Sequence, residues 1–410
     1  MTDPSPRLVS LAPDPGEPDR GRPRRTVTIA RTPAELEALR SVWSTLPVRN
    51  LDSDLDHFLT VVRADPQTLR PHVLLVQRDD APPLLVVARL VRQRFPLRIG
   101  YLDLGAWSAP TLVVSFDGVV GAETEADRRE ALAVLTDQLR TREAEAVLLQ
   151  KLEESSPVVQ TVAEQVHPWL RRRQPTVLRW FLVPPASLDE LLQQRPSRSR
   201  QRIRRELATF RRNFGDRAQI RRLDLPEHQH RLEPDLDEVD RRTYQRGLGL
   251  RDGHDDLERQ LRRLALEQGW LRAWMLYLDD RPVAFWWGML YRGVLAPGST
   301  GYDPDHAHDG VGFFTMMQMF ADLCGQPDVT EIDFGYGDAE YKQRFANASS
   351  PTCDVLLFGP RPRSLLLEAG VAGTASLSRL AGAVAERSGL ARSLKRRWRS
   401  RAAAKQSARA

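Results

Sequence analysis

The sequence has few cysteines and no long apolar run, and each shortage narrows the class of protein. Two cysteines, Cys324 and Cys353, are too few for a disulfide framework in 410 residues, so we expect buried thiols and a reducing, cytoplasmic location. The chain lacks the run of about 18 apolar residues that a transmembrane helix needs. Its N-terminus lacks the apolar segment of a secretory signal, so we expect no signal peptide.

Lysine is also scarce, since arginine supplies nearly all of the positive charge. The formal net charge is +6, which fits anionic partners. The lysines are Lys151, Lys342, Lys395 and Lys405. Where arginine is the default cation, Lys342 within a dense polar cluster indicates a need for a compact ammonium group.

Composition divides the chain into four parts. Residues 1–25 are rich in Pro, Gly, Asp and Arg without periodicity, which predicts a disordered leader. Residues 26–170 and 175–360 each run helix pair, antiparallel strands, helix, strand, and the boundary is expected at Arg171–Pro175. Residues 361–410 shift to Ala, Ser, Leu and Arg, which predicts a basic, partly helical C-terminal tail. We therefore predict two similar α/β domains, although no residue-level repeat is visible.

Periodicity and turn signals place the elements on which the later argument depends. In the first segment we expect apolar strands at 72–77, 84–91 and 113–115 and a helix at 54–62. In the second we expect Ser197 to cap a basic helix that ends at Phe214, and a second helix at 236–244. Three consecutive strands are expected at 271–277, 283–291 and 293–302, and a last one at 355–358.

The loop 306–312 precedes an apolar helix and carries two closely spaced glycines. Backbone N–H groups and the helix dipole at such a start suit a pyrophosphate, which makes Asp309, Gly310, Val311, Gly312 and Phe313 candidate cofactor-binding residues. The alternative is a simple glycine turn before a buried helix. His306 and His308 lie close together, but no further His or Cys has ligand spacing, so we expect no metal.

The segment DFGYGDAEYK follows directly after a predicted strand and is dense in ionisable groups. Asp333, Asp338 or Glu340 is a candidate base for an ammonium nucleophile. Tyr336 or Tyr341 is a candidate acid for a departing thiolate, and Lys342 a candidate for anion binding or oxyanion stabilisation. The alternative is a capped loop with Glu340 and Lys342 on a solvated helix face.

Arginines crowd the segment 195–222, where Arg198, Arg202 and Arg205 share one helical face. This face fits cofactor phosphates, a nucleic acid or an anionic lipid surface, while the alternative is a solvated amphipathic helix. The adjacent Trp286 and Trp287 lie on a predicted strand and must point to opposite faces. Either both pack in the core, or one of them lines a cleft.

In order along the chain, these motifs resemble the tandem acyltransferases of the GNAT superfamily, the FemAB-like and CelD-type proteins. The quoted pieces are SRSRQRIRRELATFRRNFG, LYLDDRPVAFWWGMLYRGVLAPGSTGYDP and DFGYGDAEYKQRF. The last is similar to a D-F-x-x-G-D-x-x-Y-K signature, which it matches at Asp333, Phe334, Gly337, Asp338, Tyr341 and Lys342. The resemblance is good over residues 175–360 and weaker over 26–170.

This resemblance implies an α/β fold of two tandem GNAT-like domains, each with a mixed, mostly antiparallel sheet flanked by helices. The first domain would be degenerate and the second would carry the activity. The co-substrate pyrophosphate would bind at Asp309–Phe313, although Ala307 replaces the family's arginine or glutamine. A backbone N–H near Ser299 would polarise the thioester, and Trp286, Tyr302 and Tyr336 would contact substrate.

The implied function is transfer of an acyl group from acyl-CoA to an amine of a small molecule, a sugar or a cell-envelope precursor. One alternative is an aminoacyl-tRNA-dependent, FemAB-like transferase with the arginine-rich helix on the tRNA. The other is a non-catalytic module that binds anions or an anionic membrane surface through the basic tail. Either membrane contact or a purely cytoplasmic location fits the composition.

Overall fold

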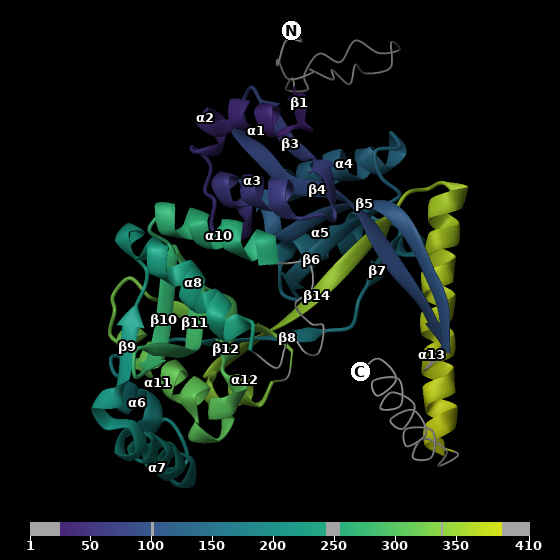
Figure 1. The fold of residues 1–410 in the computed structure, drawn as a ribbon. Coiled ribbons are helices and arrows are strands. Elements are labelled where there is room, and N and C mark those ends of the chain that lie inside the picture. The colour runs from purple at the N-terminus through teal and green to yellow at the C-terminus, as the bar shows by residue number, and fades with distance from the viewer. Residues whose placement is uncertain (1–24, 100–101, 243–254, 338, 388–410) are drawn as a thin grey trace, which may run out of the picture.

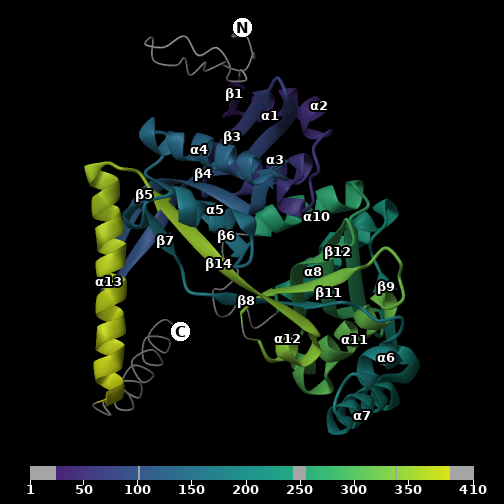
Figure 2. The ribbon, with the colours of Figure 1, turned by 180° about the vertical axis from the view of Figure 1, so that it is seen from behind.

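The computed structural model describes residues 25–99, 102–242, 255–337 and 339–387. They form one mixed, mostly antiparallel 14-stranded sheet with helices packed against it (Figures 1 and 2). The strand order is β1-β3-β4-β5-β6-β14-β8-β13-β12-β11-β10-β9, with β2 paired to β4 and β7 paired to β14. The predicted α/β class is therefore confirmed. The predicted leader, at residues 1–24, and the tail beyond residue 387 lie outside the described residues.

The first half of the sheet is covered on both faces. Its strands are β1 (Arg25–Ala30), β2 (Thr68–Pro71), β3 (Val73–Arg78), β4 (Ala81–Ile99), β5 (Leu102–Val120), β6 (Ala146–Glu153) and β7 (Arg171–Arg173). Its helices are α1 (Pro33–Ala38), α2 (Arg40–Trp43), α3 (Leu55–Ala64), α4 (Glu125–Arg140) and α5 (Pro157–Gln165). Successive side chains of a strand alternate, so Leu74 packs under α4 and α5 and Leu75 under α1 to α3.

The second half is built in the same way. Its strands are β8 (Val177–Leu182), β9 (Ala218–Arg222), β10 (Leu271–Leu278), β11 (Arg281–Tyr291), β12 (Val294–Tyr302), β13 (Glu331–Tyr336) and β14 (Ala348–Phe358). Its helices are α6 (Leu188–Gln193), α7 (Ser197–Phe214), α8 (Gln229–Asp240), α10 (Asp255–Glu267), α11 (Val311–Leu323) and α12 (Glu340–Phe345). Leu276 packs on the face of α7 and α11, and Met275 packs on the face of α8 and α10.

Each half contains one parallel strand pair joined by a crossover helix, β5–α4–β6 in the first and β12–α11–β13 in the second. Counted from its outer edge, the first half is ordered β1-β3-β4-β5-β6-β14 and the second β9-β10-β11-β12-β13-β8. The two orders match, except that β14 and β8, the last strands of the two orders, are exchanged between the halves. β8 follows the first half in the chain but pairs with β13, and β14 follows β13 but pairs with β6.

The exchange ties the halves together. Residues Thr352–Phe358 of β14 pair with β6, and residues Ala348–Thr352 pair with β8. Cys353, Val355 and Leu357 are thereby buried in the first half's core, although they come late in the sequence. Because β14 bridges both halves, we expect them to unfold together rather than separately.

A long hairpin, β4–β5, departs from the prediction. The expected strands 84–91 and 113–115 extend to 19 residues each. The extension alternates exposed arginines such as Arg92 and Arg94 with apolar residues, and its cover, helix α13 (Pro362–Arg387), is far away in sequence (Figure 2). Phe95 and Trp107 pack there with Leu367 of α13.

No helix in the described part of the chain is long and apolar enough to cross a membrane.

Two further expectations are corrected. Ser197 is the first helical residue of α7 rather than its cap, since Pro196 holds the N-cap position without a side-chain hydrogen bond. The helix expected at 236–244 starts earlier, as α8, because Leu232 and Leu236 bury one face despite Pro234; residues 243–244 lie outside the described residues. The boundary expected at Arg171–Pro175 stays a prediction; this segment contains β7, which pairs with β14.

Candidate active site

The N-terminus of α11 is open. Gly310 takes the N-cap position with a φ of 73°, which favours glycine, and no described side chain hydrogen-bonds to this end of the helix. The first N–H groups of a helix have no intrahelical partner, so those of Val311, Gly312 and Phe313 point out of its end. Asp309 is held aside by His306, at 2.9 Å between Oδ2 and Nδ1. The turn therefore presents N–H groups and a positive dipole end, as an anion cradle requires.

The strands on either side of α11 separate close to this cradle. β12 and β13 share only two registered pairs, Val294 with Glu331 and Leu295 with Ile332. Beyond these pairs, β12 continues along β11 and β13 continues along β8, so their facing edges diverge. Tyr302, at the end of β12, lies against Gly312, where an added Cβ would meet its ring at 3.3 Å. The divergence leaves β12 backbone groups unpaired by β13.

Two side chains predicted at the site, Ser299 of β12 and Trp286 of β11, make hydrogen bonds or packing contacts within the protein. The Ser299 hydroxyl accepts a hydrogen bond from Trp287 Nε1 at 2.8 Å and donates one to Glu258 at 3.2 Å. Trp286 lies on the opposite face from Trp287, as predicted, and its ring packs edge-on to Tyr341 with centroids 5.9 Å apart. Ser299 thus offers its backbone rather than its side chain, and Trp286 belongs to the packing around α11.

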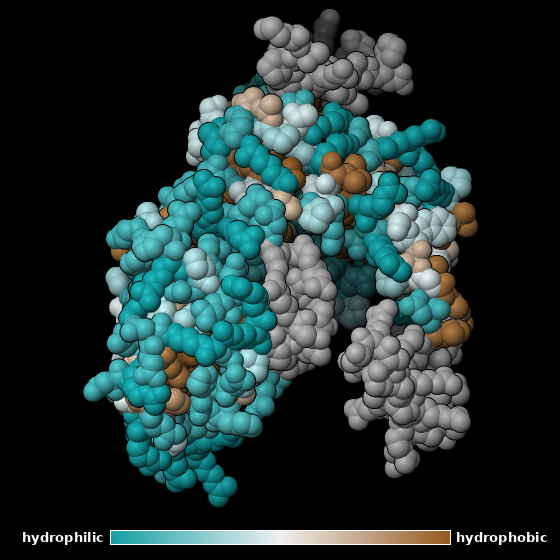
Figure 3. Space-filling model, viewed as in Figure 1, coloured by the Kyte–Doolittle hydropathy of each residue, from teal (hydrophilic) through white to brown (hydrophobic). Residues whose placement is uncertain are grey.

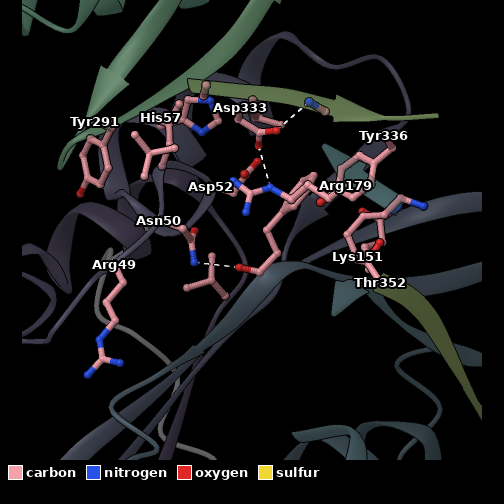
Figure 4. Close-up of a pocket in the computed structure, with 18 of the residues that line it drawn as sticks. Arg49, Asn50, Asp52, His57, Lys151, Arg179, Tyr291, Asp333, Tyr336 and Thr352 are labelled. Atoms are coloured by element: carbon pink, nitrogen blue, oxygen red, sulfur yellow. Dashed lines mark hydrogen bonds and ion pairs between the residues drawn. The ribbon is translucent and has the colours of Figure 1, made fainter. Parts of the chain in front are cut away.

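A cavity of about 970 Å³ lies between the two halves (Figure 4). The second half contributes Val294, Ala296 and Pro297 of β12 and Asp333, Gly335 and Tyr336 of β13. The first half contributes residues from the segment 49–52, from α3, from β4 and β5, and from the end of β6. The side chains of Ile332 and Phe334 face α11, so Asp333 between them faces the cavity on the other side of the sheet. Cradle and cavity therefore lie on opposite faces, with the divergence of β12 and β13 between them.

Asp333 is fixed inside this cavity by two donors. Arg179 of β8 donates through Nε to Asp333 Oδ2 at 2.9 Å, and the N–H of Gly335 donates to Oδ1 at 2.6 Å. Arg179 also pairs with Glu331. Burial opposes the charge on Arg179, but the two carboxylates raise its pKa overall. Burial raises the pKa of Glu331 against the pull of the same arginine. Asp333 is thus part of a firmly paired group rather than a free carboxylate.

The remaining predicted site residues differ in their burial and in their contacts. Lys342 donates from Nζ to the carbonyl oxygen of Tyr336 at 2.6 Å, and burial lowers its pKa. Burial also raises the pKa values of Tyr336, which lines the cavity, and of Tyr341, which packs against Phe334 and Trp286. The side chain of Glu340 is exposed at the start of α12. Asp338 lies outside the described residues.

Sequence reasoning missed the first half's contribution to the cavity, chiefly Asp52 and His57 (Figure 4). Burial raises the pKa of Asp52 to about 6, with Arg89 opposing the shift and Asp333 adding to it. Burial lowers the pKa of His57 to about 4, so its imidazole is neutral at pH 7. The run Asn50–His57, dense in polar residues before an apolar helix, was the only local signal. It reads equally well as a helix cap.

Local hydrogen bonds position this segment. Asn50 accepts from the N–H of Ser53 at 2.8 Å and donates to the carbonyl of Phe116 at 2.7 Å. Asp54 caps α3 by accepting from the N–H groups of Asp56 and His57. The hydroxyl of Tyr291, on β11 of the second half, donates to the same Asp54 at 3.1 Å. The segment is therefore anchored to both halves.

Comparison with known proteins agrees with this geometry. Residues 197–343 match the family model described as "Acetyltransferase (GNAT) domain". The fold is similar to that of FemX, with 11% identity and a TM-score of 0.53 over 81% of this chain and 98% of FemX. A conserved protein of unknown function from Bacteroides thetaiotaomicron gives 13% identity and a TM-score of 0.53 over 80% of this chain and 99% of its own. A search of curated proteins gives no match.

The fold, the open helix start and the matched domain define an acyltransferase. More particularly, residues 197–343 match the GNAT acetyltransferase domain, and the fold of the chain is similar to that of FemX. The expected GNAT acyltransferase domain is therefore confirmed for these residues. The likeness to the solved structures, at these identities, concerns the fold alone.

Proposed function

We propose that the protein transfers an acyl group from acyl-CoA to an amine of a small molecule, a sugar or a cell-envelope precursor. The observation that carries this proposal is the open start of α11 next to the divergence of β12 and β13, with a polar cavity on the far side. A phosphorylated thioester held at α11 would reach the cavity through this divergence. We also propose two GNAT-like domains, at residues 26–170 and 175–360.

The donor site would use Asp309 to Phe313 for the pyrophosphate. Helix α7 lies beside this cradle, because Phe210 stacks on Phe314 of α11 at 4.0 Å and Phe214 packs edge-on to His306. The buried face of α7 is Ile203, Leu207 and Phe210, as expected for an amphipathic helix, and its arginines are largely exposed. Exposed guanidinium groups near the cradle suit the several phosphates of coenzyme A.

The reacting groups would meet at the divergence. A backbone N–H near Ser299 would stabilise the oxyanion, and Lys342, close to Gly335, would add positive charge there. Tyr336 and Tyr341 are the candidate acids for the departing thiolate. Tyr302, at the end of β12, lies against Gly312 of the cradle and is a candidate substrate contact. Asp333, Asp338 and Glu340 stay in the proposal as candidate bases for the ammonium nucleophile. The new C–N bond forms as the C–S bond breaks, and coenzyme A leaves as its thiol.

Thermal-shift titration with acetyl-CoA and longer acyl-CoAs tests the donor. We expect a saturable rise in melting temperature with acyl-CoA and no such rise with adenosine alone. A chain that is folded by circular dichroism but is stabilised by none of these thioesters would contradict the proposal. Release of the coenzyme A thiol in the presence of an amine panel then identifies the acceptor.

Two observations keep an aminoacyl-tRNA donor as a second candidate: the likeness of the fold to FemX and the exposed arginines of α7. Filter binding of total tRNA between about 50 and 200 mM salt tests it, since phosphate contacts weaken steeply with salt. Salt-sensitive binding that is lost when Arg198, Arg202 and Arg205 are replaced by Gln supports tRNA. No binding at low salt excludes it.

The basic tail is proposed as a peripheral contact with anionic membranes, in addition to the transferase activity. Its helical part, α13, is described, while its most basic residues lie beyond residue 387. Flotation with phosphatidylglycerol vesicles compares the full chain with a chain shortened after residue 387. Equal flotation of both chains would remove this contact from the proposal.

A further inference from the structure

We propose that the cavity between the halves binds the acceptor as a primary ammonium ion at Asp52, a residue of the first half. This inference rests on the proposed function and names a binding residue and a substrate chemistry for it. It gives the first half a direct part in acceptor recognition.

The cavity's cations are already committed to carboxylates. Four basic side chains line it, and each has an acidic partner: Arg49 pairs with Glu123, Arg89 with Asp65, Lys151 with Asp354, and Arg179 with Asp333. Asp52 and Glu153 also line the cavity, and no ion pair to either carboxylate occurs among the described residues; Glu153 is exposed to solvent, whereas Asp52 is half-buried. The cavity therefore holds an anionic group without a cation of its own.

A second group at the cavity has an unmet hydrogen-bonding capacity. His57 is only 5% exposed, and its Nδ1 has no hydrogen-bond partner among the described residues. The ring lines the same cavity as Asp52 (Figure 4). A neutral imidazole nitrogen can accept a hydrogen bond from a bound N–H group. A buried, unpaired nitrogen beside an unpaired carboxylate suits a ligand that donates several hydrogen bonds, which an ammonium does.

The charge state of Asp52 supports this reading. Burial raises its pKa to about 6, and the neighbouring Asp333 adds to that shift, so a proton or another cation stabilises this site. The groups that face Asp52 are Arg89 from β4, Asp333 from β13, Arg179 from β8, and His57 and Tyr336. Both arginines are ion-paired, burial lowers the pKa of His57 to about 4, and burial raises the pKa of Tyr336. The pKa of Asp52, at about 6, lies between pH 5 and pH 8.

The cavity walls indicate what carries the ammonium. Phe58 and Val61 of α3, Leu257 and Leu261 of α10, and Met289 of β11 supply an apolar lining. A flexible alkyl chain with a terminal ammonium fits both the walls and the carboxylate. We therefore expect an acceptor whose amine sits on an aliphatic stem, rather than an aromatic or anionic amine.

Isothermal titration calorimetry with n-hexylammonium chloride tests the site without any acyl donor. The probe remains charged at pH 5 and at pH 8. Wild-type protein is expected to bind it roughly tenfold more tightly at pH 8 than at pH 5, because at pH 5 about nine-tenths of Asp52 is protonated. Asp52→Asn is expected to bind weakly and equally at both values. Glu153→Gln, which removes another carboxylate of the cavity, is the matched control and should retain the wild-type pH dependence.

The outcomes separate this proposal from the proposed function. Binding by Asp52→Asn as tight as wild type, or wild-type binding that does not change with pH, would overturn the ammonium site. Stabilisation by acetyl-CoA tests the donor independently in the same variants. Since burial opposes the charge of Asp52, Asn should be tolerated, and a melting temperature at pH 8 no lower than wild type checks this. Asp52→Ser gives a second test of the same loss.

Discussion

The two halves share a plan but differ at the start of their crossover helices. α4 in the first half is closed by its own side chains, since Thr124 accepts from the N–H of Asp127 and Asp127 accepts from the N–H of Thr124. Arg78 then pairs with the Asp127 carboxylate. α11 in the second half begins at Gly310 with no such cap. The same topology therefore leaves the start of the crossover helix without a side-chain cap in one half and caps it in the other.

The parallel strands differ in the same sense. β5 and β6 stay paired over five residues, from Thr111 with Ala146 to Ser115 with Gln150, whereas β12 and β13 share two pairs. β12 and β13 diverge early next to the open start of α11, whereas β5 and β6 stay paired next to the capped start of α4. The first half instead contributes Asp52 to the cavity (Figure 4) and pairs β6 with β14 (Figure 1). In the proposed function the second half would hold the donor, and the first half would complete the acceptor cavity.

The hydropathy of the surface also differs between the two halves. In Figure 3, hydrophilic residues cover most of the second half, and hydrophobic ones appear along the hairpin and α13 on the first half's side. Leu102 and Leu104 near the hairpin turn and Leu366 of α13 are exposed large apolar residues. The catalytic role proposed for the second half does not depend on this surface.

The largest expected effect tests whether the second half can catalyse acyl transfer without Asp52 of the first half. Asp52→Asn should lower the acyl-transfer rate at pH 8 on the order of a hundredfold, because the bound ammonium loses its counter-ion. In the wild type the rate should rise with pH through about 6, as Asp52 loses its proton, and then level off. Release of the coenzyme A thiol from acetyl-CoA with a stabilising amine measures both.

Glu153→Gln is the control for this rate measurement, since it removes another carboxylate of the same cavity. Its rate and pH profile should match the wild type. A profile for Asp52→Asn that still rises through pH 6 would assign that titration to another group.

The second effect compares two arginines that each hold two carboxylates. Arg179 pairs with Asp333 and Glu331, and Arg78 with Asp127 and Glu130. Replacing either by Met leaves partly buried carboxylates uncompensated, so each should lower the free energy of unfolding by about 2–3 kcal/mol. Urea denaturation measures this. Only Arg179→Met should also slow acyl transfer, and equal slowing by Arg78→Met would undo the contrast between the halves.

The third effect uses the second helical position of each crossover helix. Gly312→Val in α11 brings a bulky side chain to the cradle and against Tyr302, and should weaken acetyl-CoA binding roughly tenfold through lost N–H contacts. Ala126→Val is the matched change in α4, where the end is capped and the side chain is exposed. Calorimetry with acetyl-CoA should detect no change for Ala126→Val. A similar loss in both variants would argue for a general effect on the fold.

Local signals predicted the second half well and the relation between halves poorly. The strands β10 to β12 and helix α11 follow from apolar patterns within a few residues, so they were predictable. The exchange of β8 and β14 and the cover of α13 on the long hairpin depend on partners far along the chain. Asp52 and Asp333 are also far apart in the sequence and line one cavity only in the folded chain. No local pattern could therefore mark Asp52 as part of the candidate site. Arg179 on β8 was hidden for the same reason.

The smallest expected effect comes from removing the side-chain cap of α4, which tests whether the cap alone distinguishes the two halves. Thr124→Ala removes the cap of α4, which should lower the free energy of unfolding by about 1 kcal/mol. Urea denaturation measures that loss, and calorimetry should show no second acetyl-CoA site, because β5 and β6 remain paired beside the helix. Asp127 would still occupy part of the end, held by Arg78. A second binding event in this variant would mean that the cap alone, rather than cap and strand pairing together, keeps the first half from binding the donor.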